Sequence, residues 1–164
     1  MSNSGTTGVL FVCLGNICRS PLAKFIFLDL ATKAGTAERF KVDSCGTSSY
    51  HAGDDADPRT LAVARARGLT CTHCARPLRV TDFADFDYLI AMDLKNRADM
   101  LRLGAPPERV HLLRSFDPAL AGQNDDALIV PDPYYGGPDG FDRMYDMIDA
   151  ACRGLLSRLP TRQR

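Results

Sequence analysis

The feature that most constrains this chain is a short apolar run, residues 9–13, that ends in a cysteine and is followed within a few residues by a helical pattern. The stretch from Val9 to Phe25 reads VLFVCLGNICRSPLAKF. The run predicts a buried strand, and apolar residues at helical spacing predict a helix over residues 21–34, stopped by Gly35. A strand that leads into a helix is typical of a parallel sheet, whose strands are joined by crossovers.

Strands and helices alternate along the rest of the chain as well. Further strands are predicted at residues 40–44, 86–92 and 110–113. Further helices are predicted at residues 58–68, 93–103 and 141–159, the last after an Asp-, Pro- and Gly-rich connection over residues 117–140. The pattern favours a three-layer α/β fold with a central four-stranded parallel sheet and helices on both faces. In such folds ligands bind beyond the carboxyl ends of the strands, which makes the segment after Cys13 the candidate binding loop.

Length and composition narrow the class of protein. The 164 residues suit a single domain over residues 1–164, with residues 1–7 and 160–164 expected as flexible termini. The 20 basic residues balance 20 acidic ones, so the charge does not favour nucleic acid or a membrane surface as a partner. The sequence carries neither a signal-peptide pattern nor an apolar run long enough to span a membrane, and 6 cysteines are too few for a disulfide scaffold. We therefore expect a cytoplasmic protein.

The candidate loop carries the residue types that bind a tetrahedral oxyanion. Gly15 and Asn16 tolerate the unusual backbone angles of a tight curl, whose inward N–H groups would lie at a helix N-terminus. Arg19 adds a planar fork that can hold two phosphate oxygens. An arginine in a first helical turn opposes the helix dipole, and a bound anion would remove that conflict. The predicted phosphate-binding residues are Leu14, Gly15, Asn16, Ile17, Cys18 and Arg19.

Cys13 would lie directly under a phosphate bound in this loop. The positive surroundings favour its thiolate form, which is the nucleophilic form of a cysteine. Ser20 can donate a hydrogen bond to that thiolate and help it leave later in the reaction. A buried cysteine and a surface arginine would explain each residue alone, but not the whole order of strand, loop and helix.

These residues resemble the low-molecular-weight protein tyrosine phosphatases, and the resemblance spans nearly the whole chain. Five segments carry it, in the family's order: CLGNICRSP (13–21), VDSCGTSSYHAG (42–53), HCARPL (73–78), DFADFDYLIAMD (82–93) and DPYYGG (132–137). The resemblance implies a metal-independent enzyme without cofactors that hydrolyses phosphotyrosine through a phosphocysteine intermediate. Arg19 and the loop amides would stabilise the phosphate oxygens.

The same reaction needs a general acid to protonate the leaving phenol. Composition cannot select one of 18 aspartates, but Asp132 is held between Pro131 and Pro133 and is followed by two tyrosines. A carboxyl group that must meet a substrate at one angle benefits from such stiffness. The resemblance agrees, because the family's DPYYG loop supplies the acid.

The resemblance also implies the walls and the supports of the site. Tyr134 and Tyr135 would flank the substrate ring, with Tyr50 opposite, and stacked aromatic walls favour a flat phenyl group. The supports of the phosphate loop would be Asn16, Ser20, Ser44 and His73. His73 is expected to support the loop and to do no chemistry.

Several other functions could use some of the same residues. A thiol-dependent arsenate reductase shares the oxyanion loop and would need further cysteines, such as Cys71 and Cys74. Some bacterial members of the family are protein-arginine phosphatases. They carry a smaller threonine where this chain has Ile17, and the bulkier Ile17 favours phosphotyrosine as the substrate. A zinc module built on Cys71, His73 and Cys74 lacks a second ligand pair. A phosphotyrosine-binding module would not need Cys13, and an ATPase would need a nucleotide-binding motif that is absent from the sequence.

Two further expectations concern regulation by oxidation and the binding partners of the protein. Cys18 is close enough in sequence to form a disulfide with an oxidised Cys13 and so protect the nucleophile. The expected partners are phosphotyrosyl proteins, with no nucleic acid and no membrane, and the expected state is a monomer or a weak dimer.

Overall fold

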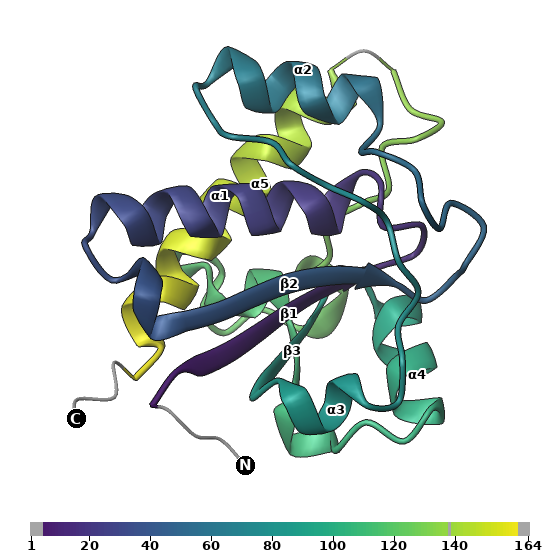
Figure 1. Cartoon of the computed structure of the whole chain (residues 1–164), viewed down its shortest axis with the longest axis vertical. Helices are drawn as coiled ribbons and strands as arrows, with labels where there is room; N and C mark the ends of the chain where they lie inside the picture. Colours follow the sequence, from purple (N-terminus) through teal and green to yellow (C-terminus); the bar gives the residue numbers. More distant parts are fainter. Residues whose placement is uncertain (1–4, 138, 161–164) are drawn as a thin grey trace.

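Four parallel strands form the centre of the molecule in the computed structural model, which describes residues 5–137 and 139–160 (Figure 1). The strands are β1 (Thr7–Cys13), β2 (Phe40–Gly46), β3 (Tyr88–Ala91) and β4 (Val110–Leu112). They lie in the order β2-β1-β3-β4, with Val12 opposite Cys45 on one side and Ala91 on the other. The predicted four-stranded parallel sheet is confirmed.

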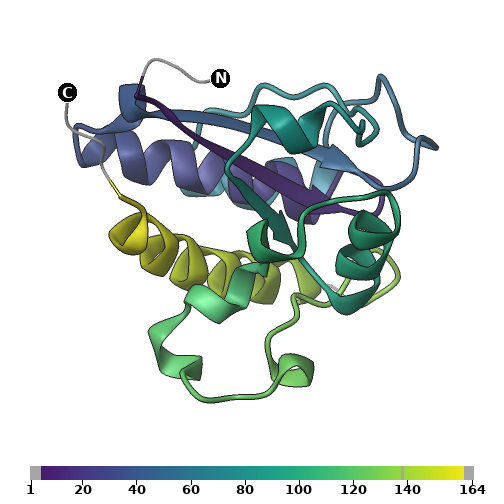
Figure 2. The ribbon, with the colours of Figure 1, turned by 90° about the horizontal axis from the view of Figure 1, so that it is seen from below.

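Helices cover both faces of this sheet, as predicted. The α-helices are α1 (Arg19–Lys33), α2 (Pro58–Ala66), α3 (Asp82–Asp85), α4 (Leu94–Arg102) and α5 (Gly140–Arg158). The short 3₁₀ helices are η1 (Ala37–Arg39), η2 (Pro107–Arg109), η3 (Leu113–Phe116), η4 (Pro118–Leu120) and η5 (Asp125–Ala127). Figures 1 and 2 show α1 and α5 packed side by side on one face, with α2 beyond them, and α3 and α4 on the other face.

The alternation of side chains along β1 divides the core between the two faces. Val9 and Phe11 join the larger cluster, beneath α1 and α5. Leu10 and Val12 join the smaller cluster with residues of α3 and α4. Both faces of β1 are buried, as expected of a central strand in a parallel sheet, and this explains why its sequence is continuously apolar.

Most element boundaries differ from the predicted ones by one or two residues. Strand β1 begins at Thr7, which is buried, so Thr7 belongs to the sheet and not to the N-terminal segment that was expected to be flexible. The other residues of the expected flexible ends, apart from Gly5, Thr6 and Pro160, lie outside the described part of the chain. The four-residue α3 was not predicted. Helix α2 ends before Gly68, whose φ of 77° explains the stop.

Helix α1 begins at Arg19, two residues earlier than predicted. Pro21 is compatible with this start because the N–H groups of a first helical turn have no partner within the helix. No side chain caps α1, and its first turn has no acidic residue. Helix α4, in contrast, is capped: the Asp93 carboxylate accepts from the N–H of Asn96, whose side-chain oxygen accepts from the N–H of Asp93. The uncapped, positively charged end of α1 is therefore suited to an anion.

No helix in residues 5–137 or 139–160 is both long and apolar enough to cross a bilayer.

Candidate active site

The loop between β1 and α1 is held by hydrogen bonds to its carbonyl groups from surrounding segments. The carbonyl oxygens of Cys13, Leu14 and Ile17 accept bonds from backbone N–H groups of Thr47, Ser48 and Asp57, at 2.9, 2.9 and 2.8 Å. A trans peptide directs its N–H opposite to its C=O. Because these carbonyls are bonded to the surrounding chain, the N–H groups that follow them turn toward the inside of the loop, where an oxyanion would accept them.

Asn16 gives the loop its shape. It has a φ of 58°, the one positive φ of a non-glycine residue in the described part of the chain, and Asn tolerates this left-handed region better than most residues. Its side chain is fully buried: the amide nitrogen donates to Ser20 Oγ at 2.8 Å and to Ser44 Oγ at 3.0 Å, and the amide oxygen accepts from the N–H of Arg76 at 3.0 Å. Asn16 therefore ties the loop to α1, to β2 and to the segment after His73.

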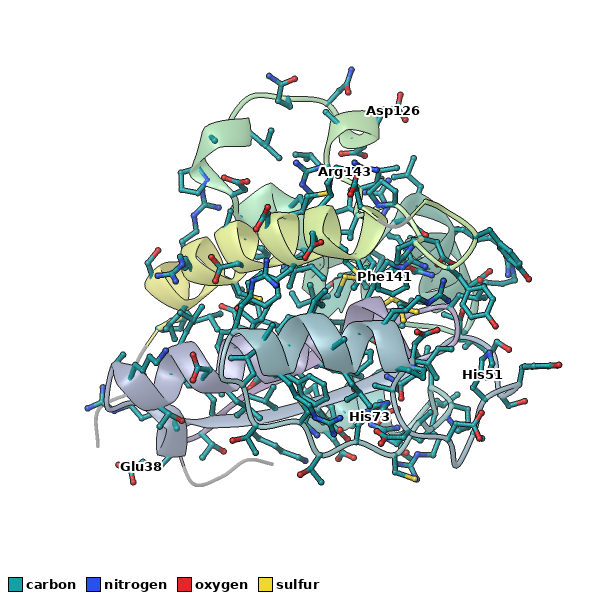
Figure 3. The ribbon with its side chains drawn as sticks, turned by 90° about the horizontal axis from the view of Figure 1, so that it is seen from above. Glu38, His51, His73, Asp126, Phe141 and Arg143 are labelled. Carbon is teal, nitrogen blue, oxygen red and sulfur yellow. The ribbon has the colours of Figure 1, made fainter. Side chains whose placement is uncertain are left out.

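His73 bonds the same residue through its backbone. His73 Nε2 lies 2.6 Å from the carbonyl oxygen of Asn16, and because a carbonyl only accepts, Nε2 carries the proton. Burial lowers the pKa of His73, with the bond to Asn16 acting against that effect. Figure 3 labels His73 on the segment that follows α2. The structure thus brings together all four predicted supports, Asn16, Ser20, Ser44 and His73.

Cys13 is buried at the floor of the loop. Its Sγ lies 3.0 Å from Ser20 Oγ and accepts a longer bond, 3.4 Å, from the N–H of Ser20. Ser20 Oγ also lies 3.3 Å from the carbonyl oxygen of Cys45. The sulfur thus contacts both the hydroxyl group and the backbone N–H of Ser20, in the first turn of α1.

Arg19 is the largest fully buried polar side chain of the site, at 2% exposure. Its Nη1 donates to Asp93 Oδ2 at 2.7 Å and to the carbonyl oxygen of Val130 at 2.9 Å. Burial alone would lower the pKa of Arg19, but Cys13, Asp93 and Asp132 together raise it, so the guanidinium is charged. Asp93 therefore fixes Arg19 in the site, a role that the sequence analysis missed. Its position after β3, at the same sheet edge as Cys13, was the available signal.

Asp132 reaches the site from the loop before α5. Its Oδ2 lies 3.6 Å from Arg19 Nη2, and its Oδ1 accepts a hydrogen bond from the N–H of Tyr134 at 3.0 Å. The side chain of Asp132 is 43% exposed, so it is open to a substrate and to water. This loop, residues 131–137, is called the acid loop below.

The loop between β1 and α1, residues 14–18, is called the phosphate loop. Together with the acid loop and the loop after β2, it lines a cavity of about 420 Å³. Ten of its lining residues were predicted, namely Cys13, Leu14, Gly15, Ile17, Cys18, Arg19, Tyr50, Asp132, Tyr134 and Tyr135. Asn16 does not line it, because its side chain points into the protein. Tyr50 and Tyr135 are largely exposed, at 86% and 96%, so Tyr134 is the aromatic wall that the fold holds in place.

Ser48 and His51 also line this cavity and were missed by the sequence analysis. Both lie in the loop after β2, where Tyr50 was predicted, and this neighbourhood was the available signal. His51 Nδ1 lies 3.2 Å from Asp54 Oδ2, and the His51 ring packs against that of Tyr50 with centroids 4.9 Å apart. Figure 3 shows His51 on the outer part of this loop.

The remaining cysteines contribute little to the site. Cys71 is half-buried and Cys74 exposed, and neither lines the cavity. Among the described residues no three His, Cys, Asp or Glu side chains form a group that could hold a metal ion. Cys18 is buried and lines the cavity, and burial, with smaller effects of Asp57 and Cys13, raises its pKa to about 12.

The geometry defines a class of site: a buried cysteine and a charged arginine at an oxyanion loop, faced by a carboxylate. Comparison with known proteins agrees. The model of the low molecular weight phosphotyrosine protein phosphatase family matches residues 8–164. A low molecular weight protein-tyrosine-phosphatase of Streptomyces coelicolor is 46% identical over 156 residues, which cover 93% of each chain. The chain belongs to this family.

Solved structures place the fold in the same group. The crystal structure of a protein tyrosine phosphatase from Entamoeba histolytica, with Hepes in its active site, matches with a TM-score of 0.85 at 36% identity, covering 93% of this chain and 96% of that one. The crystal structure of an arginine phosphatase from Drosophila matches with a TM-score of 0.81 at 32% identity, covering 91% of this chain and 95% of that one. One fold therefore carries both specificities among similar proteins.

Proposed function

We propose that this protein is a protein tyrosine phosphatase that hydrolyses phosphotyrosine through a phosphocysteine intermediate at Cys13. The observation that carries the proposal is the convergence of three groups on one cavity. Cys13 lies at its floor, the buried guanidinium of Arg19 lies beside it, and Asp132 lies 3.6 Å from that guanidinium on the opposite loop. The names of the similar proteins support the same activity.

The first chemical step transfers the phosphoryl group to the enzyme. The thiolate of Cys13 attacks phosphorus, a P–S bond forms, and the bond between phosphorus and the tyrosine oxygen breaks. Asp132 gives its proton to the departing phenolate oxygen. Arg19 and the loop amides stabilise the equatorial oxygens, where negative charge is held in the transition state.

The second step returns the enzyme to its starting state. A water molecule gives a proton to the ionised Asp132 and attacks phosphorus, and the P–S bond breaks. Inorganic phosphate leaves, and Cys13 is again a thiolate that Ser20, 3.0 Å away, can stabilise by a hydrogen bond. Asp132 thus acts as acid in one step and as base in the other.

A phosphoarginine substrate is the second candidate, because a structurally similar protein is an arginine phosphatase. Ile17 argues against it, since this side chain lines the cavity and would crowd a guanidinium group. The flat ring of Tyr134 favours a phenyl group instead. Arsenate reduction has weaker support, because neither Cys71 nor Cys74 lines the cavity.

The test measures phosphate release from a phosphotyrosyl peptide and from a phosphoarginyl peptide, with reductant and a metal chelator present. The expected result is turnover of the phosphotyrosyl peptide by the parent, a much lower kcat/KM on phosphoarginine, and no turnover by Cys13→Ser. Turnover by Cys13→Ser would refute the cysteine mechanism. A higher kcat/KM on the phosphoarginyl peptide would assign the second candidate instead.

A further inference from the structure

Arg59, in the first turn of α2, does not line the cavity but contacts structures on both sides of it. Its Nε and Nη2 bind the two carboxylate oxygens of Asp57 at 3.0 and 2.9 Å. Its Nη1 donates to the carbonyl oxygen of Tyr134 at 3.1 Å. The guanidinium carbon also lies over two aromatic rings, 5.2 Å from the centroid of Tyr134 and 4.6 Å from that of Phe141.

One end of this arrangement is attached to the phosphate loop. The N–H of Asp57 donates to the carbonyl oxygen of Ile17 at 2.8 Å, and Asp57 is only 7% exposed. Asp57 also caps α2 by accepting from the N–H of Arg59 at 2.8 Å. The hydrogen bonds from Arg59 lower the pKa of Asp57, so the pair is ionised at neutral pH.

The other end is attached to the acid loop. The N–H of Tyr134, the residue whose carbonyl and ring Arg59 holds, donates to Asp132 Oδ1 at 3.0 Å. Arg59 therefore fixes the residue that orients the proposed general acid. In Figure 3 Phe141, the second ring under Arg59, lies at the first turn of α5, directly after the acid loop.

We propose that Arg59 is a positioning residue that ties the acid loop to the phosphate loop, so that Asp132 is held at the right distance from a phosphoryl group on Cys13. The inference rests on the proposed function and adds to it a residue that touches neither substrate nor sulfur. Arginine suits this role because its planar fork can bind a carboxylate and a carbonyl at once while its face stacks on rings, which lysine cannot reproduce.

The test uses two substrates that depend differently on the acid. Phosphotyrosine has a poor leaving group that needs a proton, whereas p-nitrophenyl phosphate has a good one that needs it less. For Arg59→Ala we expect kcat/KM to fall about tenfold or more on the phosphotyrosyl peptide and less than about twofold on p-nitrophenyl phosphate, because a misplaced acid costs most where protonation matters most. Arg59→Lys should lose nearly as much, since it keeps the charge but not the fork.

Arg67→Ala is the matched control. Arg67 follows α2 directly, packs its guanidinium 4.1 Å from the ring centroid of Tyr145 and pairs with Asp142 at 3.6 Å, so it also joins the α2 region to α5. Among the described residues, Arg67 forms no hydrogen bond, ion pair or ring contact with the acid loop. We expect Arg67→Ala to keep the parent's kcat/KM on both substrates, and thermal unfolding of each variant checks that it is folded.

A double variant asks whether Arg59 acts through Asp132. If it does, adding Arg59→Ala to Asp132→Asn should cost no further activity, because the group being positioned is already absent. Three results would each overturn the positioning role of Arg59. They are equal losses of kcat/KM on both substrates, a loss that adds to that of Asp132→Asn, and full activity of Arg59→Lys. The proposed function would fail separately, by an inactive parent or an active Cys13→Ser.

Discussion

At the scale of single residues, the site depends on a few buried polar groups that satisfy one another. Asn16 makes three side-chain hydrogen bonds while its backbone adopts a left-handed conformation, and its carbonyl is bonded to His73. Such a group is costly to disturb, because a buried donor or acceptor that loses its partner costs about 1–3 kcal/mol. The resemblance named these residues, but only the folded chain shows that Asn16 connects them.

The buried His73 makes the stability of the protein depend on pH, and the direction of this dependence follows from the lowered pKa of His73. The unfolded chain takes up a proton on this histidine below about pH 6.5, whereas burial lowers the pKa of folded His73. The unfolded state therefore binds more protons in that window, and the free energy of unfolding falls as the pH drops below about 6.5. We expect the fall to be shallower in His73→Gln, in which an amide donor can still reach Asn16.

Urea unfolding of the parent and His73→Gln between pH 7 and 5 measures the two slopes. His111 remains in both proteins, and because burial lowers its pKa as well, only the difference between the slopes belongs to His73. Identical slopes would show that His73 contributes nothing to the pH dependence.

Cys18 is proposed to protect Cys13 by forming a disulfide with it after peroxide oxidation. With a pKa raised to about 12, Cys18 is almost entirely a thiol at neutral pH, and only its thiolate attacks an oxidised sulfur. We expect disulfide closure after a brief peroxide pulse to quicken about tenfold per pH unit between pH 6.5 and 8.5. After longer exposure to peroxide, which oxidises an unprotected sulfenic acid irreversibly, recovery by thiol should be lower in Cys18→Ala than in the parent. Equal recovery in Cys18→Ala and the parent would contradict the proposal.

At the scale of elements, the end of β2 supports the phosphate loop by close contact. A Cβ on Gly46 would lie 2.7 Å from the carbonyl oxygen of Leu14 and 3.1 Å from the backbone nitrogen of Asn16. Gly46 is thus required by the approach of the loop to the strand, and not by a positive φ. The conformation of the phosphate loop therefore depends on contact with β2 as well as on β1 and α1, which the loop joins.

Gly46→Ala should displace the phosphate loop and lower kcat/KM on a phosphotyrosyl peptide about tenfold or more, because small misplacements at a reacting centre are costly. Gly8→Ala is the control: its Cβ would lie 2.9 Å from Cα of Phe86, a similar clash at the opposite end of β1. We expect both variants to lose stability and only Gly46→Ala to lose activity in the folded state. An equal loss of activity would show that strain anywhere in the sheet disturbs the site.

The sequence was informative about helices in proportion to their length. The four long helices were predicted because their periodic patterns are sustained, whereas α3 has four residues, too few for a helical period. The short strands β3 and β4 were predicted because apolar residues predominate in them. The contact of Arg59 with Tyr134 joins residues 75 positions apart, and no local signal encodes it. The loop between β1 and α1 could be singled out in the sequence because its residues are consecutive.

At the scale of the whole molecule, α5 closes one face of the sheet by packing on α1 and on η3. Gly154 of α5 lies against the backbone of η3, where an added Cβ would clash with the carbonyl oxygen of Phe116. Alanine normally stabilises a helix relative to glycine by about 1 kcal/mol, so the sign of this substitution tests the packing. The sequence alone would predict the wrong sign.

Gly154→Ala is expected to destabilise the protein by about 3 kcal/mol, because backbone must move to admit the methyl group. The denaturant midpoint measures it, with Arg153→Ala, at the exposed neighbouring position of α5, as the control expected to change stability by less than about 0.5 kcal/mol. A gain in stability for Gly154→Ala would mean that α5 does not pack on η3 as described.

The central claim is that Cys13 receives the phosphoryl group, and direct detection of that adduct tests it best. The protein is mixed with a phosphotyrosyl peptide, denatured within milliseconds and analysed by mass spectrometry and phosphorus NMR. We expect one phosphoryl group on sulfur, in the segment that carries Cys13, and none in Cys13→Ser. Full phosphate release by the parent without any phosphorylated cysteine at any quench time, or a phosphoryl group on another residue, would contradict it.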